Sequence, residues 1–126
     1  MKVLACDTGT RRHGFALSDS KGLFVVRTWT AEAGEKPEKP ILESAKREGL
    51  SEVVLGLPLT MSGTESDQSV WVRALGKSIE EGGVGVCWVD ERLTTPAGVR
   101  GPKRDEWAAA TILEIALQQR RGVRGG

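Results

Sequence analysis

The sequence has a single histidine and two cysteines in 126 residues. One histidine leaves little from which to build a Ser-His-Asp triad or a histidine-ligated zinc site. We therefore interpret His13 as a turn residue without a catalytic role. Cys6 and Cys87 lie inside apolar runs, which favours reduced, buried thiols over a disulfide and is typical of a cytoplasmic protein.

Long apolar runs and an excess of one charge sign are also absent. No stretch approaches the ~18 apolar residues of a membrane span, and no charged-then-apolar leader opens the chain, so we expect a cytoplasmic protein with no membrane partner. The net charge of +1, from 18 basic and 17 acidic residues, gives no overall attraction to polyanions. Binding to nucleic acid must therefore depend on local clusters of basic residues.

Length and composition indicate one folded domain. Hydrophobic residues make up 39% of the chain, and 16 glycines bring the apolar share into the globular range. A chain of this length fits one domain and buries enough surface for a core without disulfides. We expect a single domain over residues 1–121 and a flexible basic tail over 122–126.

Hydrophobic periodicity predicts three strands, then a helix, a strand, a helix, a strand and a final helix. The expected strands span residues 2–7, 14–18, 23–30, 52–56 and 84–90, and the expected helices span 40–49, 66–81 and 105–119. Tight turns make the first three strands an antiparallel meander, and each strand–helix–strand step requires parallel pairing. The fold class is α/β, with a five-stranded mixed sheet flanked by helices.

Acidic residues stand at two of the three carboxyl ends of the parallel strands, where open sheets bind their ligands. Asp7 ends the first strand, and Asp90 and Glu91 end the last. Because side chains alternate between the two faces of a strand, only one of Asp90 and Glu91 can point into a site. Clustered carboxylates repel, and oxygen donors without a histidine or cysteine cluster select Mg²⁺ or Mn²⁺. We interpret these acids as metal-binding and catalytic. The alternatives are a turn acid at Asp7 and pairing with Arg92 at the last strand.

Asp105 opens the last helix, where an acid is also a routine N-cap or partner of the helix dipole. Its helical phase places it on the same face as Ala108, Ala109, Ile112 and Ala116. A carboxylate at the head of this inward face is expected to point toward the sheet, and the small alanines permit close approach.

Basic residues flank the predicted acidic site at two places, where they would offset the charge of backbone phosphates. They are Arg11 and Arg12 after the first strand, and Arg100, Lys103 and Arg104 before the last helix. The four tryptophans, at positions 29, 71, 88 and 107, are interpreted as packing residues rather than platforms for bases.

Four ordered motifs together resemble the YqgF/RuvX family. They are DTGTRRHGFALSD at 7–19, VVLGLPLTMSGT at 53–64, DERLTT at 90–95 and DEWAAATIL at 105–113. The resemblance covers nearly the whole chain. It implies a ribonuclease H-like fold with strand order 3-2-1-4-5, related to the RuvC Holliday-junction resolvases.

The same resemblance implies a metal-dependent nuclease for structured nucleic acid, chiefly for maturing the 5′ end of pre-16S ribosomal RNA. Its metal ligands and catalytic acids would be Asp7, Glu91 or Asp90, and Asp105. Two Mg²⁺ or Mn²⁺ ions about 4 Å apart would be bridged by Asp7. The residues expected to contact or shape the substrate groove are Thr8, Gly9, Thr10, Arg11, Arg12, Gly14, Gly56, Leu57, Pro58, Gly63, Arg92, Lys103 and Arg104.

Two features keep other functions open. The fourth strand ends in Gly-Leu-Pro, where RuvC-type relatives hold an acid, and the stretch 96–104 is short for the family. The short stretch motivates one alternative, a catalytically inactive nucleic-acid-binding module. Kinship with the RuvC resolvases gives the other, a junction resolvase acting on branched DNA and expected as a homodimer. Nucleotide phosphate binding of the actin type needs two lobes, for which one domain is too small.

Overall fold

The computed structural model describes residues 1–91 and 102–125, and side chains of the second segment over 104–120. The strands are β1 (Leu4–Asp7), β2 (Arg12–Ser18), β3 (Val25–Glu32), β4 (Glu52–Leu57) and β5 (Gly85–Asp90). The helices are α1 (Glu38–Arg47), α2 (Asp67–Glu81) and α3 (Pro102–Gly125). This confirms the predicted order of three strands followed by alternating helices and strands.

The five strands form one sheet in the order β3-β2-β1-β4-β5, as expected. β2 pairs antiparallel with β1 and β3, whereas β4 pairs parallel with β1 and β5. Asp7 lies opposite Gly14, and Leu57 lies opposite Asp90. β1, β4 and β5 therefore end at the same edge of the sheet.

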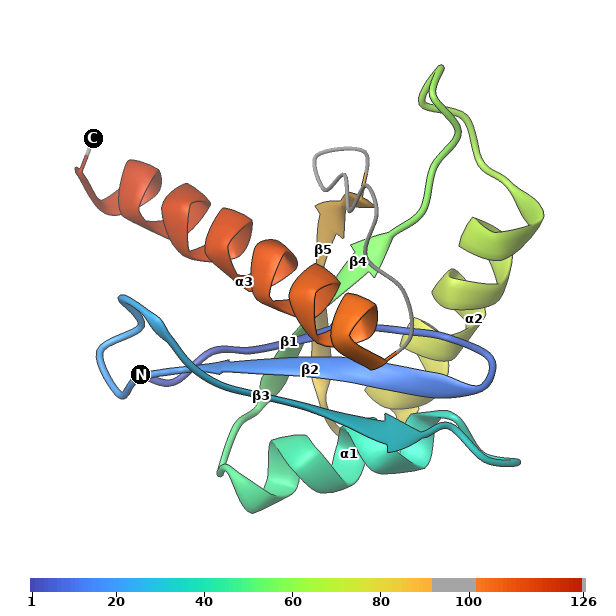
Figure 1. Ribbon diagram of the computed structural model, residues 1–126, viewed down its shortest axis with the longest axis horizontal. Helices are drawn as coiled ribbons and strands as arrows, with labels where there is room; N and C mark the ends of the chain where they lie inside the picture. The colour runs from blue at the N-terminus through green and yellow to red at the C-terminus, as the bar shows by residue number, and fades with distance from the viewer. Residues whose placement is uncertain (92–101, 126) are drawn as a thin grey trace.

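Helices cover both faces of the sheet. α3 crosses one face and packs on Val3, Ala5 and Val54, while α1 and α2 cover the other face (Figure 1). Alternation along β1 explains this division, because Val3 and Ala5 belong to one core cluster and Leu4 and Cys6 to the other. Asp7 continues the alternation on the α3 side.

Two helices differ from the predicted bounds. α1 begins at Glu38, and Pro40 lies in its first turn, where the missing N–H has no intrahelical partner to lose. α3 begins at Pro102, which places Asp105 inside the first turn instead of at the N-cap. It also continues past Gln119 to Gly125, since a glycine costs a helix only about 1 kcal/mol. The flexibility of residues 122–126 stays a prediction.

The cysteines and the length and polarity of the helices bear on two further expectations. Cys6 and Cys87 are both free thiols, as predicted, but only Cys6 is buried, because Cys87 lies in the edge strand β5 and is partly exposed. Among the described helices, none is both long enough and apolar enough to cross a bilayer.

Candidate active site

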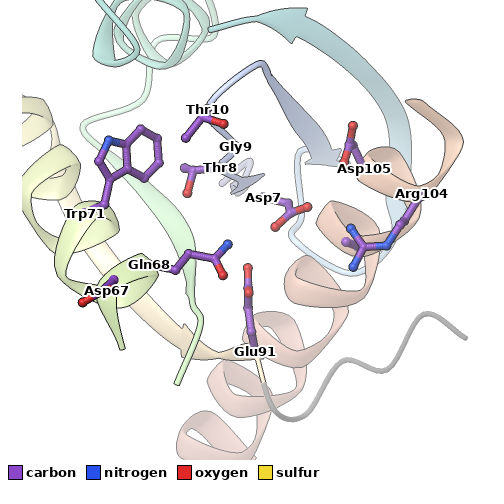
Figure 2. Close-up of a pocket in the computed structure, with 11 residues that line it drawn as sticks. Asp7, Thr8, Gly9, Thr10, Asp67, Gln68, Trp71, Glu91, Arg104 and Asp105 are labelled. Carbon is purple, nitrogen blue, oxygen red and sulfur yellow. The ribbon is translucent and has the colours of Figure 1, made fainter. Parts of the chain in front are cut away.

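A cavity of about 650 Å³ lies at the edge where β1 and β5 end. The β1–β2 turn, the start of α2, the residue after β5 and the start of α3 form its walls (Figure 2). The lining residues are Asp7, Thr8, Gly9, Thr10, Asp67, Gln68, Trp71, Glu91, Arg104, Asp105 and Ala108.

Three of the acids singled out in the sequence line this cavity. Asp7 ends β1, Glu91 follows β5, and Asp105 lies in the first turn of α3. The carboxylate of Glu91 points toward Asp7 (Figure 2). Asp90, at the end of β5, is not among the described lining residues, so alternation directs Glu91 into the cavity. Segments separated by more than eighty residues thus place carboxylates in one cavity.

Asp7 is the residue of the cavity whose pKa is most clearly raised. Burial raises the pKa of Asp7 to about 8, and a side-chain hydrogen bond with Glu91 and the negative charges of Glu91 and Asp105 contribute in the same direction. The positive charge of Arg104 acts in the opposite direction on this pKa. A cation bound beside Asp7 would lower this pKa, in the same direction as Arg104 does.

Asp105 lies in the same cavity but is engaged by a different partner. Arg12 Nε donates to Asp105 Oδ2 at 2.5 Å, and both side chains are partly buried. Arg12 was expected to contact phosphate, and the structure instead places its guanidinium against a predicted metal ligand.

Two glycines allow the acids to approach the sheet. A Cβ at Gly14 would overlap the backbone carbonyl of Asp105, so β2 accepts α3 only without a side chain there. A Cβ at Gly56 would lie 2.5 Å from Glu91 Oε1 and 2.6 Å from Ile112 Cδ1. Gly56 therefore contributes space for the Glu91 side chain and is not among the described residues that line the cavity.

The interpretation of His13 as a turn residue is wrong. His13 lies in β2 and its side chain is fully buried. The Gly9 N–H donates to His13 Nδ1 at 3.2 Å, and His13 Nε2 lies 2.8 Å from the Pro37 carbonyl oxygen. These two bonds fix the neutral tautomer, with the proton on Nε2, and tie the β1–β2 turn to the segment before α1.

The remaining predicted substrate residues divide between the cavity and its surroundings. Thr8, Gly9, Thr10 and Arg104 line it. Among described residues, the lining does not include Arg11 or the loop from Gly56 to Gly63. In that loop, the Pro58 carbonyl accepts a hydrogen bond from Ser66 Oγ at 3.1 Å, which ties it to the start of α2. Arg92, Arg100 and the side chain of Lys103 lie outside the described part of the chain.

The first turns of α2 form a wall that the sequence interpretation missed. Asp67, Gln68 and Trp71 line the cavity opposite the carboxylates (Figure 2). The helical spacing of the sequence could have identified them. Gln68 precedes the buried Val72 by four residues and so shares its inward face at the end of the helix that reaches the sheet edge.

The donor set fits a hard divalent cation in its chemistry. Carboxylate oxygens line the cavity, and a cation would relieve the burial and the negative charges that raise the pKa of Asp7. Within residues 1–91 and 102–125, no three acidic, histidine or cysteine side chains already converge on one point as a bound ion requires. Asp105 is held in an ion pair with Arg12.

Comparison with known proteins adds a relationship over nearly the full chain. Residues 1–119 match the RuvX family, described as Holliday junction resolvase. A Cutibacterium acnes protein named "Putative pre-16S rRNA nuclease" is 33% identical over 130 residues, which cover 92% of this chain and 81% of the relative. A protein of the same name from Moorella thermoacetica is 35% identical, over 96% of this chain and 81% of the relative.

The fold has solved counterparts as well. Thermus thermophilus RuvC, in a complex with a Holliday junction substrate, superposes with a TM-score of 0.60 at 16% identity and covers 97% of this chain and 96% of RuvC. At that identity the likeness concerns the fold, which is the ribonuclease H-like arrangement expected from the motifs. By sequence match over residues 1–119 and by these relatives, the chain belongs to the RuvX family of nucleases.

Proposed function

We propose that this protein is a metal-dependent nuclease that hydrolyses phosphodiester bonds in structured nucleic acid. Its proposed task is maturation of the 5′ end of pre-16S ribosomal RNA in the cytoplasm. The observation that carries the proposal is the presence of Asp7, Glu91 and Asp105, from three separate elements, in one cavity of a member of this family. The names of the Cutibacterium and Moorella relatives support the choice of substrate.

The three carboxylates would hold the cations, and we propose two Mg²⁺ or Mn²⁺ ions. When bound, such ions lower the pKa of a water molecule and stabilise a leaving oxygen. Asp7 is the residue best placed to contact both ions, because the charges of Glu91 and of Asp105 both act on it. Asp105 must leave Arg12 to complete the set, which frees that guanidinium for the substrate phosphate.

The chain itself positions the substrate. Thr8, Gly9 and Thr10 line the cavity, where the two threonines carry hydroxyl groups, and Arg104 supplies a positive charge beside Asp7. The hydrolysis forms a bond from the water oxygen to phosphorus and breaks the bond from phosphorus to the 3′ oxygen. The products are a 5′-phosphate and a 3′-hydroxyl.

The test compares a pre-16S ribosomal RNA fragment with a four-way DNA junction, each with Mg²⁺ and with Mn²⁺. Asp7→Asn and Glu91→Gln should lose most of the activity, whereas Glu81→Gln, an exposed acid at the far end of α2, should retain it. Wild-type turnover in Asp7→Asn would show that this cavity is not the catalytic site. Binding without cleavage in every metal tested would identify a nucleic-acid-binding module instead.

A second candidate function is resolution of four-way DNA junctions, which the description of the matching family favours. We propose for this case a homodimer, since two symmetric strand cuts require two sites related by a two-fold axis. Preference for the junction over the ribosomal RNA fragment in the same assay, together with a dimer by sedimentation, would select this function.

A further inference from the structure

The wall of the cavity opposite the carboxylates carries an aromatic side chain. Trp71 is half-buried: the indole packs against the core cluster between the sheet, α1 and α2, and it also lines the cavity near Thr8 and Thr10 (Figure 2). An indole held by the core on one side presents a fixed surface on the other. Such a surface stacks on a flat ring with little loss of conformational entropy.

Gln68 extends from the same helix into the cavity. Its side-chain amide is exposed and directed toward the space between Thr8 and Glu91 (Figure 2). A primary amide donates and accepts hydrogen bonds at once, which suits the edge of a nucleobase. The α2 wall thus offers one stacking group and one bifunctional polar group within a single helical turn.

The start of α2 is held firmly enough to serve as a binding wall. Ser66 Oγ accepts from the Ser69 N–H at 3.1 Å, and Ser69 Oγ accepts from the Ser66 N–H at 2.7 Å. Glu65 is fixed in turn by Arg73 Nε at 2.7 Å and by Ser69 Oγ at 3.1 Å. This reciprocal capping fixes the first turn before any ligand binds.

Acidic side chains stand on both walls of the cavity. Asp7, Glu91 and Asp105 form one acidic side, which accepts a phosphate only through cations, and Arg104 is the only basic residue in the described lining. The opposite wall carries the exposed acid Asp67, which also repels a phosphate, beside the uncharged Gln68 and Trp71. The part of a nucleotide that fits Gln68 and Trp71 is therefore its uncharged base.

We propose that Trp71 and Gln68 bind an unpaired nucleobase of the substrate beside the phosphate that the carboxylate side receives. The inference rests on the proposed nuclease function and names the substrate class more narrowly. A base in a continuous duplex is stacked on both faces and paired along its edge, so it reaches an indole inside a cavity only when unpaired or flipped out. The cavity of about 650 Å³ has the size of pockets that enclose small-molecule ligands.

Intrinsic tryptophan fluorescence tests the stacking directly. The titrations use the wild-type protein with Ca²⁺, which also binds carboxylate oxygens, and gel electrophoresis checks that the probes stay intact. The probes are a ten-nucleotide single-stranded RNA and the blunt duplex formed with its complement. The single strand should quench the emission, Trp71→Phe should abolish that quenching, and Trp107→Phe, an exposed tryptophan outside the lining, should retain it. Equal quenching in both variants, or by the duplex, would overturn the proposal.

Affinity for a labelled single strand supplies the second measurement. Trp71→Leu should bind about 5- to 150-fold more weakly, the range for loss of one base–aromatic stack. Gln68→Ala should bind about 2- to 12-fold more weakly, and Gln118→Ala, an exposed glutamine of α3, should bind as the parent does. Because Gln68 is exposed, this variant decides the question even if Trp71→Leu fails to fold, and unchanged affinity in Gln68→Ala would then refute the assignment.

The two proposals fail in different ways. If no metal supports cleavage while Trp71→Phe still abolishes quenching, the nuclease function is wrong and the base site stands. If cleavage requires Asp7 and Glu91 but Trp71→Phe leaves quenching intact, the base site alone is wrong.

Discussion

Gly14 of β2 and Asp105 of α3 are in direct backbone contact, so close that a Cβ on Gly14 would overlap the Asp105 carbonyl group. Gly14 is also the residue paired with Asp7 across the β1–β2 ladder. One glycine therefore sets the approach of α3 to the strand that carries the central carboxylate. The position of Asp105 depends on the absence of a side chain as much as on the helix that bears it.

Gly14→Ala should push the first turn of α3 away from the sheet. We expect a loss of about 1–3 kcal/mol in the free energy of unfolding and a fall of about a hundredfold in cleavage rate, because displacement of a catalytic group by ~1 Å has that effect. Gly85→Ala is the matched control, since its Cβ would meet Glu52 Cβ at an ordinary 3.6 Å. Chemical denaturation and single-turnover cleavage measure both quantities. Full activity in Gly14→Ala would show that the contact does not position Asp105.

The chain positions of the acids could be predicted because parallel strands place their carboxyl ends at one sheet edge. This reasoning indicated Asp7 and the pair of Asp90 and Glu91, and helical phase indicated Asp105. It could not decide between Asp90 and Glu91, of which only Glu91 lines the cavity. It could not locate the Arg12–Asp105 ion pair, which joins residues 93 apart through the packing of α3 on β2. Nor could it separate Trp71 from the other tryptophans, because all four occupy positions in or beside regular elements and only the tertiary arrangement places Trp71 in the cavity with the carboxylates.

If Asp105 binds a cation as proposed, Arg12 competes with that cation for its carboxylate. In Arg12→Gln the carboxylate loses its ion pair, so Mg²⁺ should bind about two- to fivefold more tightly, the range for a partly exposed pair. Affinity for nucleic acid should fall, and the slope of log K against log salt concentration should decrease in magnitude by about one. Calorimetric titration with Mg²⁺ and binding at several salt concentrations measure these changes.

Arg11→Gln removes the same charge from an exposed neighbour that is absent from the described lining, so it controls for net charge. Weaker Mg²⁺ binding in Arg12→Gln than in Arg11→Gln would contradict the competition and show that the guanidinium holds Asp105 in its binding position.

His13 makes the β1–β2 turn sensitive to acid. Burial lowers the pKa of His13 from its ordinary value of about 6.5, against a smaller opposite effect of the hydrogen bond to Pro37. Below pH ~6.5 the unfolded chain takes up a proton that the folded protein resists, so stability falls as the pH is lowered toward the folded pKa. Protonation at Nδ1 would also break the bond from the Gly9 N–H.

As the sole histidine, His13 gives one set of imidazole resonances, and their NMR titration should have a midpoint below 6.5. His13→Phe should cost about 1–3 kcal/mol, since the Gly9 N–H and the Pro37 carbonyl lose their partner. It should also lack the portion of the acid destabilisation that begins near pH 6.5. A midpoint at or above 6.5 in the wild-type protein would contradict this account.

Asp7 should limit stability in the absence of metal. Its pKa in the folded protein, about 8, exceeds the value of 3.8 for a free side chain. Between these values the folded protein holds a proton that the unfolded chain releases. The free energy of unfolding therefore declines as the pH rises, and the decline is complete above pH ~8.

Asp7→Asn carries no titrating group, so at pH 8 to 9 in EDTA it should be more stable than the wild type by about 1–2 kcal/mol, while it loses cleavage activity. Mg²⁺ should raise the melting temperature of the wild-type protein and have little effect on the variant, because a cation offsets the negative charges around Asp7. Asp67→Asn, which removes an exposed acid of the same cavity, is the control for net charge. Lower stability of Asp7→Asn at pH 8 in EDTA would mean that the ionised carboxylate has a stabilising partner and that no repulsion remains for a metal to relieve.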